Sequence, residues 1–222
     1  MTTLRARPAA RLSFAACALL AAIALPSRGR AQTPADAAPV APSAASATID
    51  RLHATLLEVM KNASALGYEG RRAKLAPVID QVYDLPFMAK VAAGKNWKDL
   101  DPGAQQRFVE TFSRLTIANY AGRFTGWDGE AFLVESEGDA GQGTRMVRTK
   151  LTQTNDKDVQ LDYRLRDLGG AWRIIDVYLN GTVSELALRR SEYGALIDRE
   201  GFAALIQALD AKIAALSSGA EK

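Results

Sequence analysis

The strongest strand and turn signals lie in VQLDYRLRDLGGAWRIIDVYLNGTVSE, residues 159–185. In its first half, apolar residues such as Leu161 and Tyr163 alternate with polar ones, which is the period of a strand with one buried and one solvated face. The pair of Gly169 and Gly170 then predicts a tight turn, because glycine adopts a positive φ without steric cost. The stretch therefore begins with the first strand and the turn of a β-hairpin.

The second strand of this hairpin, residues 171–180, is apolar on both faces. Alternation divides its apolar side chains into two sets, Trp172, Ile174 and Tyr178 on one face and Ile175, Val177 and Leu179 on the other. A strand that is apolar on both faces is covered on both faces, at least locally. Asn180 and Gly181 end the strand, and the pattern turns helical from Ser184. The hairpin therefore predicts a helical cover over the sheet.

Two further strands precede the hairpin. Phe132 and Val134 indicate a short strand, and residues 144–153 indicate a longer one with Val147 and Leu151 on a single face. Short turns join all four segments in series. This order predicts an antiparallel four-stranded meander.

Helical periodicity flanks the sheet on both sides. The apolar spacing predicts helices over residues 48–66, 70–82, 84–94, 101–124, 183–190, 192–199 and 201–216. Asp101 followed by Pro102 marks the start of the longest helix, because Asp caps a helix and Pro suits its first turn. N- and C-terminal helices around an antiparallel sheet predict an α+β fold, with the helices covering the apolar face.

The first residues have the pattern of an export signal. Arg5, Arg7 and Arg11 precede an apolar run over residues 12–25, which a small-residue cleavage site follows. This is typical of a Sec signal peptide over residues 1–31, and the run falls short of the ~20 residues that a membrane span requires. We therefore expect a periplasmic protein.

Three more segments follow the predicted signal peptide. Residues 32–47 are rich in Ala, Pro and Ser and predict a disordered linker. Residues 48–216 carry all of the helical and strand periodicity, so we expect them to form a single domain. The remaining residues, 217–222, are predicted to be a flexible tail.

Net charge limits the possible binding partners, and cysteine content limits how the fold can be stabilised. The whole chain has 28 basic and 25 acidic residues, a formal charge of +3. Five of the basic residues and none of the acidic ones lie in the predicted signal peptide, which leaves 23 against 25, or −2. An acidic mature chain predicts no nucleic-acid partner. Because Cys17 lies in the signal peptide and is the single cysteine, core packing rather than disulfides must hold the exported domain.

The residues that common enzyme sites require are largely missing from the sequence. It has no Gly-rich phosphate loop and no Gly-x-Ser-x-Gly motif, and its single histidine, His53, has no second His and no Cys in the predicted mature chain with which to form a metal site. We therefore expect no cofactor, no metal and no catalytic residue. One enzymatic alternative stays open, with Asp162 and Asp176 on adjacent strands as an acid–base pair. Pairing of these carboxylates with arginines of the sheet is the simpler interpretation.

Apolar and aromatic side chains are concentrated on the long helix and on the hairpin. They are Phe108, Phe112, Tyr120 and Phe124 of the helix, and Tyr163, Trp172, Ile174, Val177 and Tyr178 of the hairpin. If helix and sheet close fully on each other, these side chains form a core. If the two are held apart, they line a deep apolar pocket of the kind that binds a lipophilic ligand. Periodicity is compatible with both arrangements.

Three longer stretches carry a family resemblance. They are GKNWKDLDPGAQQRFVETFSRLTIANYAGRF (94–124), VQLDYRLRDLGGAWRIIDVYLNGTVSELALRRSEY (159–193) and GFAALIQALDAKI (201–213). Their order and spacing resemble the MlaC or toluene-tolerance family of periplasmic lipid-shuttle proteins over most of residues 50–216. The stretch GTVSEL and the residues 189–191 are closer to the branch associated with hopanoid biosynthesis, called HpnM.

The resemblance implies a helix–sheet fold with the shape of nuclear transport factor 2 and acyl chains buried between helices and sheet. It implies a monomer that carries phospholipid, or a hopanoid, between an outer-membrane lipoprotein complex and an inner-membrane ABC transporter. The candidate pocket residues are then Phe87, Met88, Val91, Phe108, Phe112, Leu115, Tyr120, Phe124, Val147, Leu161, Tyr163, Trp172, Ile174, Val177 and Tyr178. The resemblance supplies no catalytic residue.

The function that we expect is thus that of a periplasmic lipid carrier. Two alternatives remain at this point. One is an adaptor protein without catalytic activity, whose core is closed. The other is an enzyme of the same fold that acts on a lipophilic substrate, with Asp162 or Asp176 as its acid or base.

Overall fold

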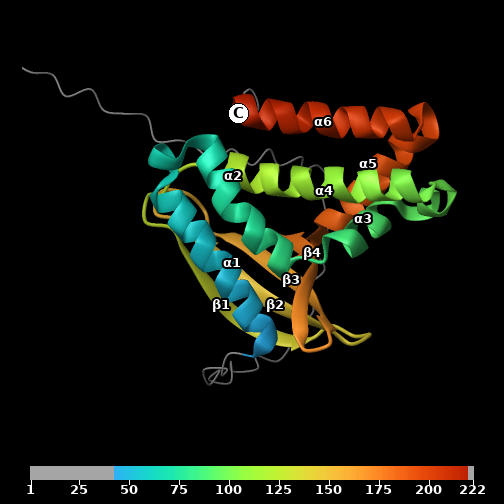
Figure 1. Ribbon diagram of the computed structural model, residues 1–222. Coiled ribbons are helices and arrows are strands. Elements are labelled where there is room, and N and C mark those ends of the chain that lie inside the picture. Colours follow the sequence, from blue (N-terminus) through green and yellow to red (C-terminus); the bar gives the residue numbers. More distant parts are fainter. Residues whose placement is uncertain (1–42, 220–222) are drawn as a thin grey trace, which may run out of the picture.

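The computed structural model of the protein describes residues 43–219 (Figure 1), so the predicted signal peptide, most of the linker and the last three residues of the tail lie outside the described residues. Its strands are β1 (Ala131–Asp139), β2 (Thr144–Thr152), β3 (Val159–Leu168), β4 (Ala171–Leu179) and β5 (Val183–Ser184). Its helices are α1 (Ala44–Lys61), α2 (Ala63–Val82), α3 (Leu85–Ala93), the 3-10 helix η1 (Gly94–Asp99), α4 (Pro102–Arg123), α5 (Glu185–Glu200) and α6 (Phe202–Ser218). The α+β class predicted from the sequence is confirmed.

The strands form one antiparallel sheet in the order β1-β2-β3-β4-β5, which confirms the meander. Leu168 pairs with Ala171 across the predicted tight turn. The two glycines between them, Gly169 and Gly170, have φ angles of 68° and 95°, as a two-residue hairpin loop requires. The fifth strand, β5, was not predicted, because its two residues are too few to show a periodic pattern.

A β-bulge in β4 interrupts the pairing with β3. Leu165 pairs with Ile174, whereas the preceding residue of β3, Arg164, pairs with Asp176. Ile175 is therefore an extra residue with no partner of its own on β3. Such an insertion shifts the alternation of all later side chains by one position.

Because of the bulge, the residues of β4 that face inward differ in part from those predicted. Trp172 and Ile174 lie on the inner face as expected, but beyond the bulge the inward-facing residues are Val177 and Leu179, which pair with inward-facing residues of β3. Tyr178 lies on the outer face instead. The prediction was wrong because it assumed an unbroken period of two along the whole strand.

The helices form a layer over the inner face of the sheet. Helices α1, α2, α3 and α5 pack against the sheet, whereas α4 makes its principal contacts with α2, α3 and α6. Figure 1 shows α4 lying between α6 and the part of the molecule that contains the sheet. The predicted start of α4 is confirmed, since the Asp101 side chain accepts a hydrogen bond from the Ala104 backbone N–H at 2.9 Å.

Several helix boundaries differ from the sequence prediction. Helix α1 ends at Lys61 instead of residue 66 and α2 begins at Ala63, although the non-helical Gly67 interrupts α2 near the expected break. The expected break near residue 191 is absent, because the buried residues Leu186 and Tyr193 are two turns apart on one continuous α5. Helix α6 extends to Ser218, into the predicted tail. At the other end, α1 begins at Ala44, so residues 43–47 belong to the folded domain and not to the predicted linker.

A buried carboxylate on β1 explains the early start of α1. Glu137 accepts hydrogen bonds from the hydroxyls of Ser43 and Ser46 and from the Ser46 backbone N–H, and it forms an ion pair with Arg145. A negative charge is favourable at a helix N-terminus. Burial opposes ionisation of Glu137, but these hydrogen bonds and the Arg145 charge outweigh it and lower the pKa of the carboxyl below its ordinary value.

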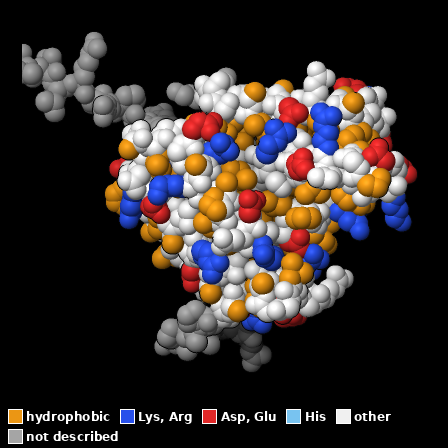
Figure 2. All heavy atoms as spheres, viewed as in Figure 1, with side chains coloured by type: hydrophobic (Ala, Val, Ile, Leu, Met, Phe, Trp, Pro, Cys, Tyr) orange, Lys and Arg blue, Asp and Glu red, His pale blue; other side chains and the backbone are white. Residues whose placement is uncertain are grey.

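The surface carries charges of both signs. Figure 2 shows Lys and Arg side chains interspersed with Asp and Glu over the visible face. Several form exposed ion pairs, such as Lys95 with Asp198 at 2.9 Å, and pairs of this kind contribute little to stability. Within residues 43–219, no helix is both long enough and apolar enough to cross a membrane.

Replacing Glu137 by Gln should destabilise the protein by about 2 kcal/mol at pH 7, because Arg145 and the Ser hydroxyls lose a charged acceptor. Because folding lowers the pKa of Glu137, its contribution is present above the ordinary carboxyl pKa and is lost as the pH falls through the lower, folded-state value. Urea unfolding of both proteins across this pH range measures the difference, which should vanish in acid.

The matched control is Glu135→Gln on the same strand. Glu135 pairs with Lys150 at 2.8 Å, but its side chain is 36% exposed, against 2% for Glu137. The control should therefore cost less than about 1 kcal/mol. Equal losses for the two variants would show that the cap on α1 has no special importance.

Candidate functional site

An apolar cavity lies between the second half of α4 and the inner face of the sheet, with a volume of about 100 Å³. The sheet supplies three cross-strand pairs, Leu151 with Val159, Leu161 with Leu179, and Tyr163 with Val177. Helix α4 supplies Thr116, Asn119, Tyr120 and Arg123, followed by Phe124 at its C-cap. The remaining wall comes from Tyr83, Met88, Glu185, Leu186 and Arg189.

One stripe of α4 forms both the cavity wall and part of the core. The α4 residues in the wall are spaced three and four apart, which places them on one face of the helix. Toward the N-terminus, the same stripe continues through Phe112 and Phe108, both completely buried. Phe108 packs edge-on against Tyr193 of α5 and Phe202 of α6, with ring centroids 6.2 and 6.0 Å apart. The core and the pocket that the sequence left as alternatives are thus both present, in different halves of α4.

Three tyrosines lie along the cavity with their hydroxyls largely satisfied inside the protein. The hydroxyls of Tyr83 and Tyr120 are hydrogen-bonded to each other, and the Tyr163 hydroxyl lies 3.2 Å from His53 Nε2. Burial raises the pKa of all three tyrosines, so they are neutral at physiological pH. Their rings therefore add neutral, mostly apolar surface to the wall.

His53 is a packing residue behind this wall. Its ring stacks on Phe132 with centroids 4.1 Å apart, and burial lowers its pKa to about 3. A neutral imidazole is what such an environment favours. His53 is therefore a buried, packed residue of α1.

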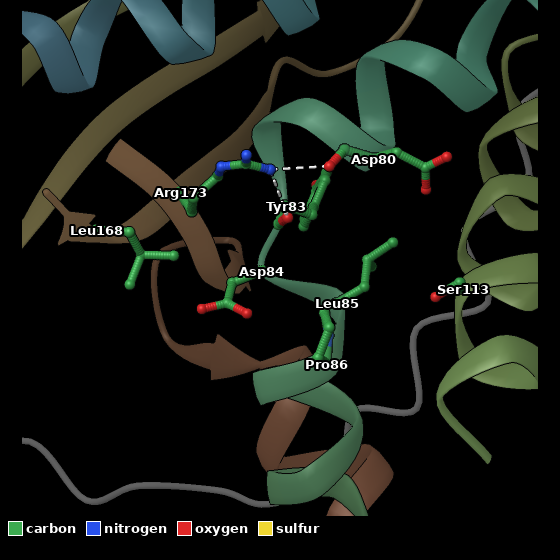
Figure 3. A pocket seen from close by; sticks show the side chains of 8 residues that line it. All are labelled: Asp80, Tyr83, Asp84, Leu85, Pro86, Ser113, Leu168 and Arg173. Atoms are coloured by element: carbon green, nitrogen blue, oxygen red, sulfur yellow. Dashed lines mark hydrogen bonds between the residues drawn. The ribbon is translucent and has the colours of Figure 1, made fainter. Parts of the chain in front are cut away.

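A second hollow lies at the surface and is lined by both polar and apolar residues (Figure 3). It has a volume of about 390 Å³, and Asp80, Asp84, Ser113 and Arg173 are among its lining residues. Arg173 donates a hydrogen bond to the Asp80 carbonyl oxygen at 2.8 Å, and Asp84 is paired with Arg166. Although this hollow is larger, its Arg173 and Asp84 already have partners within the protein. The apolar cavity is therefore the stronger candidate for a functional site.

The structure distributes the fifteen predicted pocket residues over four environments. The cavity wall contains Met88, Tyr120, Phe124, Leu161, Tyr163 and Val177. The adjoining core contains Phe108, Phe112, Leu115, Val147 and Ile174. Phe87, Val91 and Trp172 are half-buried against that core. Tyr178 lies on the outer face of the sheet, because the bulge shifts the alternation of β4.

Ten residues of the wall were not among the predicted pocket residues: Tyr83, Thr116, Asn119, Arg123, Leu151, Val159, Leu179, Glu185, Leu186 and Arg189. Three of them carried a usable signal, because Leu151, Val159 and Leu179 alternate in step with predicted pocket residues of the same strands. The polar wall residues of α4 could be found only from their helical spacing, which places them on the same face as the apolar stripe. The residues from α5 had no signal, since their position depends on how the helix packs.

The two carboxylates considered as an acid–base pair lie on the outer face of the sheet, away from the cavity. Asp162 accepts a hydrogen bond from the Thr149 backbone N–H at 3.3 Å. Asp176 accepts one from the Ser184 hydroxyl at 2.6 Å and one from the Leu186 backbone N–H at 3.1 Å. Neither forms an ion pair within residues 43–219, so the expected pairing with an arginine is wrong. Over the same residues, no group of three or more His, Cys, Asp or Glu is placed to hold a metal ion.

Fold and cavity together define a class of protein, an α+β domain in which an antiparallel sheet and a long helix enclose an apolar cavity. A family model described as "MlaC protein" matches residues 50–211. The chain therefore belongs to the MlaC protein family, and the resemblance seen in the sequence is confirmed.

Two known proteins illustrate this relationship. The toluene tolerance protein ttg2D of Pseudomonas putida is 26% identical over 172 residues, which cover 77% of this chain and 76% of the relative. A solved structure of a phospholipid-binding protein from Ralstonia solanacearum, in complex with a phospholipid, is similar with a TM-score of 0.65. The two chains are 24% identical, and the match covers 78% of this chain and 98% of the other. This second likeness confirms the fold.

The division of α4 into a core half and a cavity half can be tested by stability measurements. Phe112→Ala should cost about 3–5 kcal/mol, because it removes a completely buried ring from a closed core. Leu161→Ala should cost about half as much, because Leu161 is half-buried and already borders an empty space, so that fewer packing contacts are lost. Chemical denaturation of both variants measures the two values. Equal costs would contradict the division.

Proposed function

We propose that this protein is a periplasmic carrier that binds the acyl chains of a phospholipid in the cavity between α4 and the sheet. In this role it shuttles lipid between the outer and inner membranes. The apolar cavity, in a chain of the MlaC family, is the observation that carries the proposal. The ligand class is supported by the similar fold of the Ralstonia solanacearum protein, which is described as phospholipid-binding.

The driving force for binding is the transfer of acyl chains out of water, worth ~0.8 kcal/mol for each buried methylene. A volume of about 100 Å³ is below the roughly 300–1,000 Å³ of typical ligand pockets. Loading must therefore widen the space between α4 and the sheet. The contacts of Phe108 with α5 and α6 fix the first half of α4. We therefore place this widening at the C-terminal half of α4, near Tyr120 and Phe124.

The partners that we propose are an outer-membrane lipoprotein complex and an inner-membrane ABC transporter, as the family resemblance implies. Acyl chains gain a similar free energy in the cavity and in a bilayer, so transfer runs near balance and the partners set its direction. A hopanoid is the alternative ligand, which rests on the resemblance to the HpnM branch. None of these steps requires a catalytic residue.

The bulge in β4 provides a sharp test, because it places neighbouring residues on opposite faces of the sheet. Val177→Trp should add an indole ring to the cavity and remove most of the copurifying lipid. Tyr178→Trp, on the outer face, should leave the lipid content unchanged. Native mass spectrometry of protein purified from its own periplasm measures the adduct, and circular dichroism confirms that both variants are folded.

The mass of the adduct also separates the alternatives. A phospholipid-sized adduct on the wild-type protein supports the proposal, and a hopanoid-sized adduct supports the HpnM alternative. A wild-type protein that carries no lipid after gentle purification would favour the adaptor with a closed core. Equal lipid loss in both tryptophan variants would show that the cavity is not the binding site.

A further inference from the structure

The wall of the cavity carries a small set of polar groups that its apolar interior does not explain. Asn119 and Arg123 come from the last turns of α4, and Glu185 and Arg189 come from the first turns of α5. We call these four residues the cavity mouth. They bring two guanidinium groups and one carboxylate to the same apolar site.

Arg189 is unusual among the half-buried arginines of the described chain. Its guanidinium carbon lies 5.4 Å from the centroid of the buried Phe112 ring, and the described residues offer it no hydrogen bond or ion pair. The other half-buried arginines within residues 43–219 all have polar partners; they are Arg71, Arg145, Arg164, Arg166 and Arg173. A partly desolvated charge without a partner is costly, so this position calls for an anion.

The guanidinium of Arg123 also brings positive charge to the cavity mouth. Burial raises the pKa of Tyr120, while the positive charges of Arg123 and Arg189 oppose this rise and the charge of Glu185 adds to it. All three charged groups therefore lie close enough to interact with the Tyr120 side chain. Arg123 is exposed and, like Arg189, forms no ion pair with any described residue. Two positive charges against one negative charge leave the mouth with a net attraction for anions.

We propose that Arg189, assisted by Arg123, binds the anionic phosphate of a lipid head group at the cavity mouth. The planar guanidinium fork matches the oxygen atoms of a phosphate, and the neighbouring Phe112 ring fixes its orientation. Acyl chains then occupy the apolar interior while the phosphate stays at the edge of the protein. This inference rests on the proposed carrier function and narrows its ligand class to phosphate-bearing lipids, in preference to uncharged ones.

The test compares two lipids that differ in the phosphate. Full-length mature protein is incubated with vesicles that contain phosphatidylglycerol or with vesicles that contain a diacylglycerol of the same chain length, and uptake is measured by native mass spectrometry. Arg189→Gln should lower the ratio of phosphatidylglycerol to diacylglycerol uptake about tenfold, because a charge-assisted contact to phosphate is lost. Arg123→Gln should lower it less, since Arg123 is more exposed.

The matched control is Arg190→Gln, which removes an exposed charge of the same helix from a position outside the cavity wall. Its uptake ratio should equal that of the wild type. A similar drop for Arg189→Gln and Arg190→Gln would reduce the effect to general electrostatics and overturn the proposal. An unchanged ratio in Arg189→Gln would also overturn it.

Two further outcomes distinguish a head-group site from a free-anion site and from a protein that carries no lipid. If inorganic phosphate binds the wild type and not Arg189→Gln, while lipid uptake is the same in both, the mouth is a free-anion site and the head-group assignment is wrong. If the wild type takes up neither lipid, the carrier function itself fails and this inference fails with it. A lowered uptake ratio in Arg189→Gln, with normal uptake of diacylglycerol, supports both the carrier function and the head-group site.

Discussion

An aromatic cluster fixes one half of α4 and leaves the other half over a cavity, and the remaining architecture follows from this constraint. Phe108 is completely buried between Tyr193 of α5 and Phe202 of α6, and edge-to-face contacts of this kind are among the stronger packing interactions. Because α4 is held by α2, α3 and α6, its second half does not have to close on the sheet. The same apolar stripe therefore stabilises the fold at one end and remains available to a ligand at the other.

The sheet is adapted to this arrangement by the extra residue at Ile175. Without the bulge, Val177 and Leu179 would point outward, and the cavity would lose one side of two cross-strand pairs. With it, Asp176 points outward and accepts a hydrogen bond from the Leu186 N–H at the start of α5. One inserted residue thus completes the apolar wall and also positions the helix that supplies Arg189 to the mouth.

The polar groups near the cavity fall into two sets with different consequences. His53 and the tyrosines are neutral, because burial shifts each pKa away from the charged form, and they satisfy one another behind or along the wall. Arg189 and Arg123 form no ion pair with any of the described residues. A site with a neutral interior and a cationic edge suits a molecule with apolar chains and an anionic head.

Local sequence patterns were enough to establish the α+β class, the meander, the start of α4 at Asp101, the two-glycine turn and the family, because these depend on periodicity, capping and motif order. They also identified part of the wall, since residues such as Tyr120 and Leu161 belong to apolar faces that are visible in the sequence. Only the packed structure revealed that Phe112 is core while Phe124 borders the cavity, that Tyr178 faces outward, and that Arg189 of α5 and Arg123 of α4 line the same cavity. The physical reason is that periodicity specifies which side chains share a face, whereas the contacts of that face depend on where distant elements pack and on single insertions that leave no trace in composition.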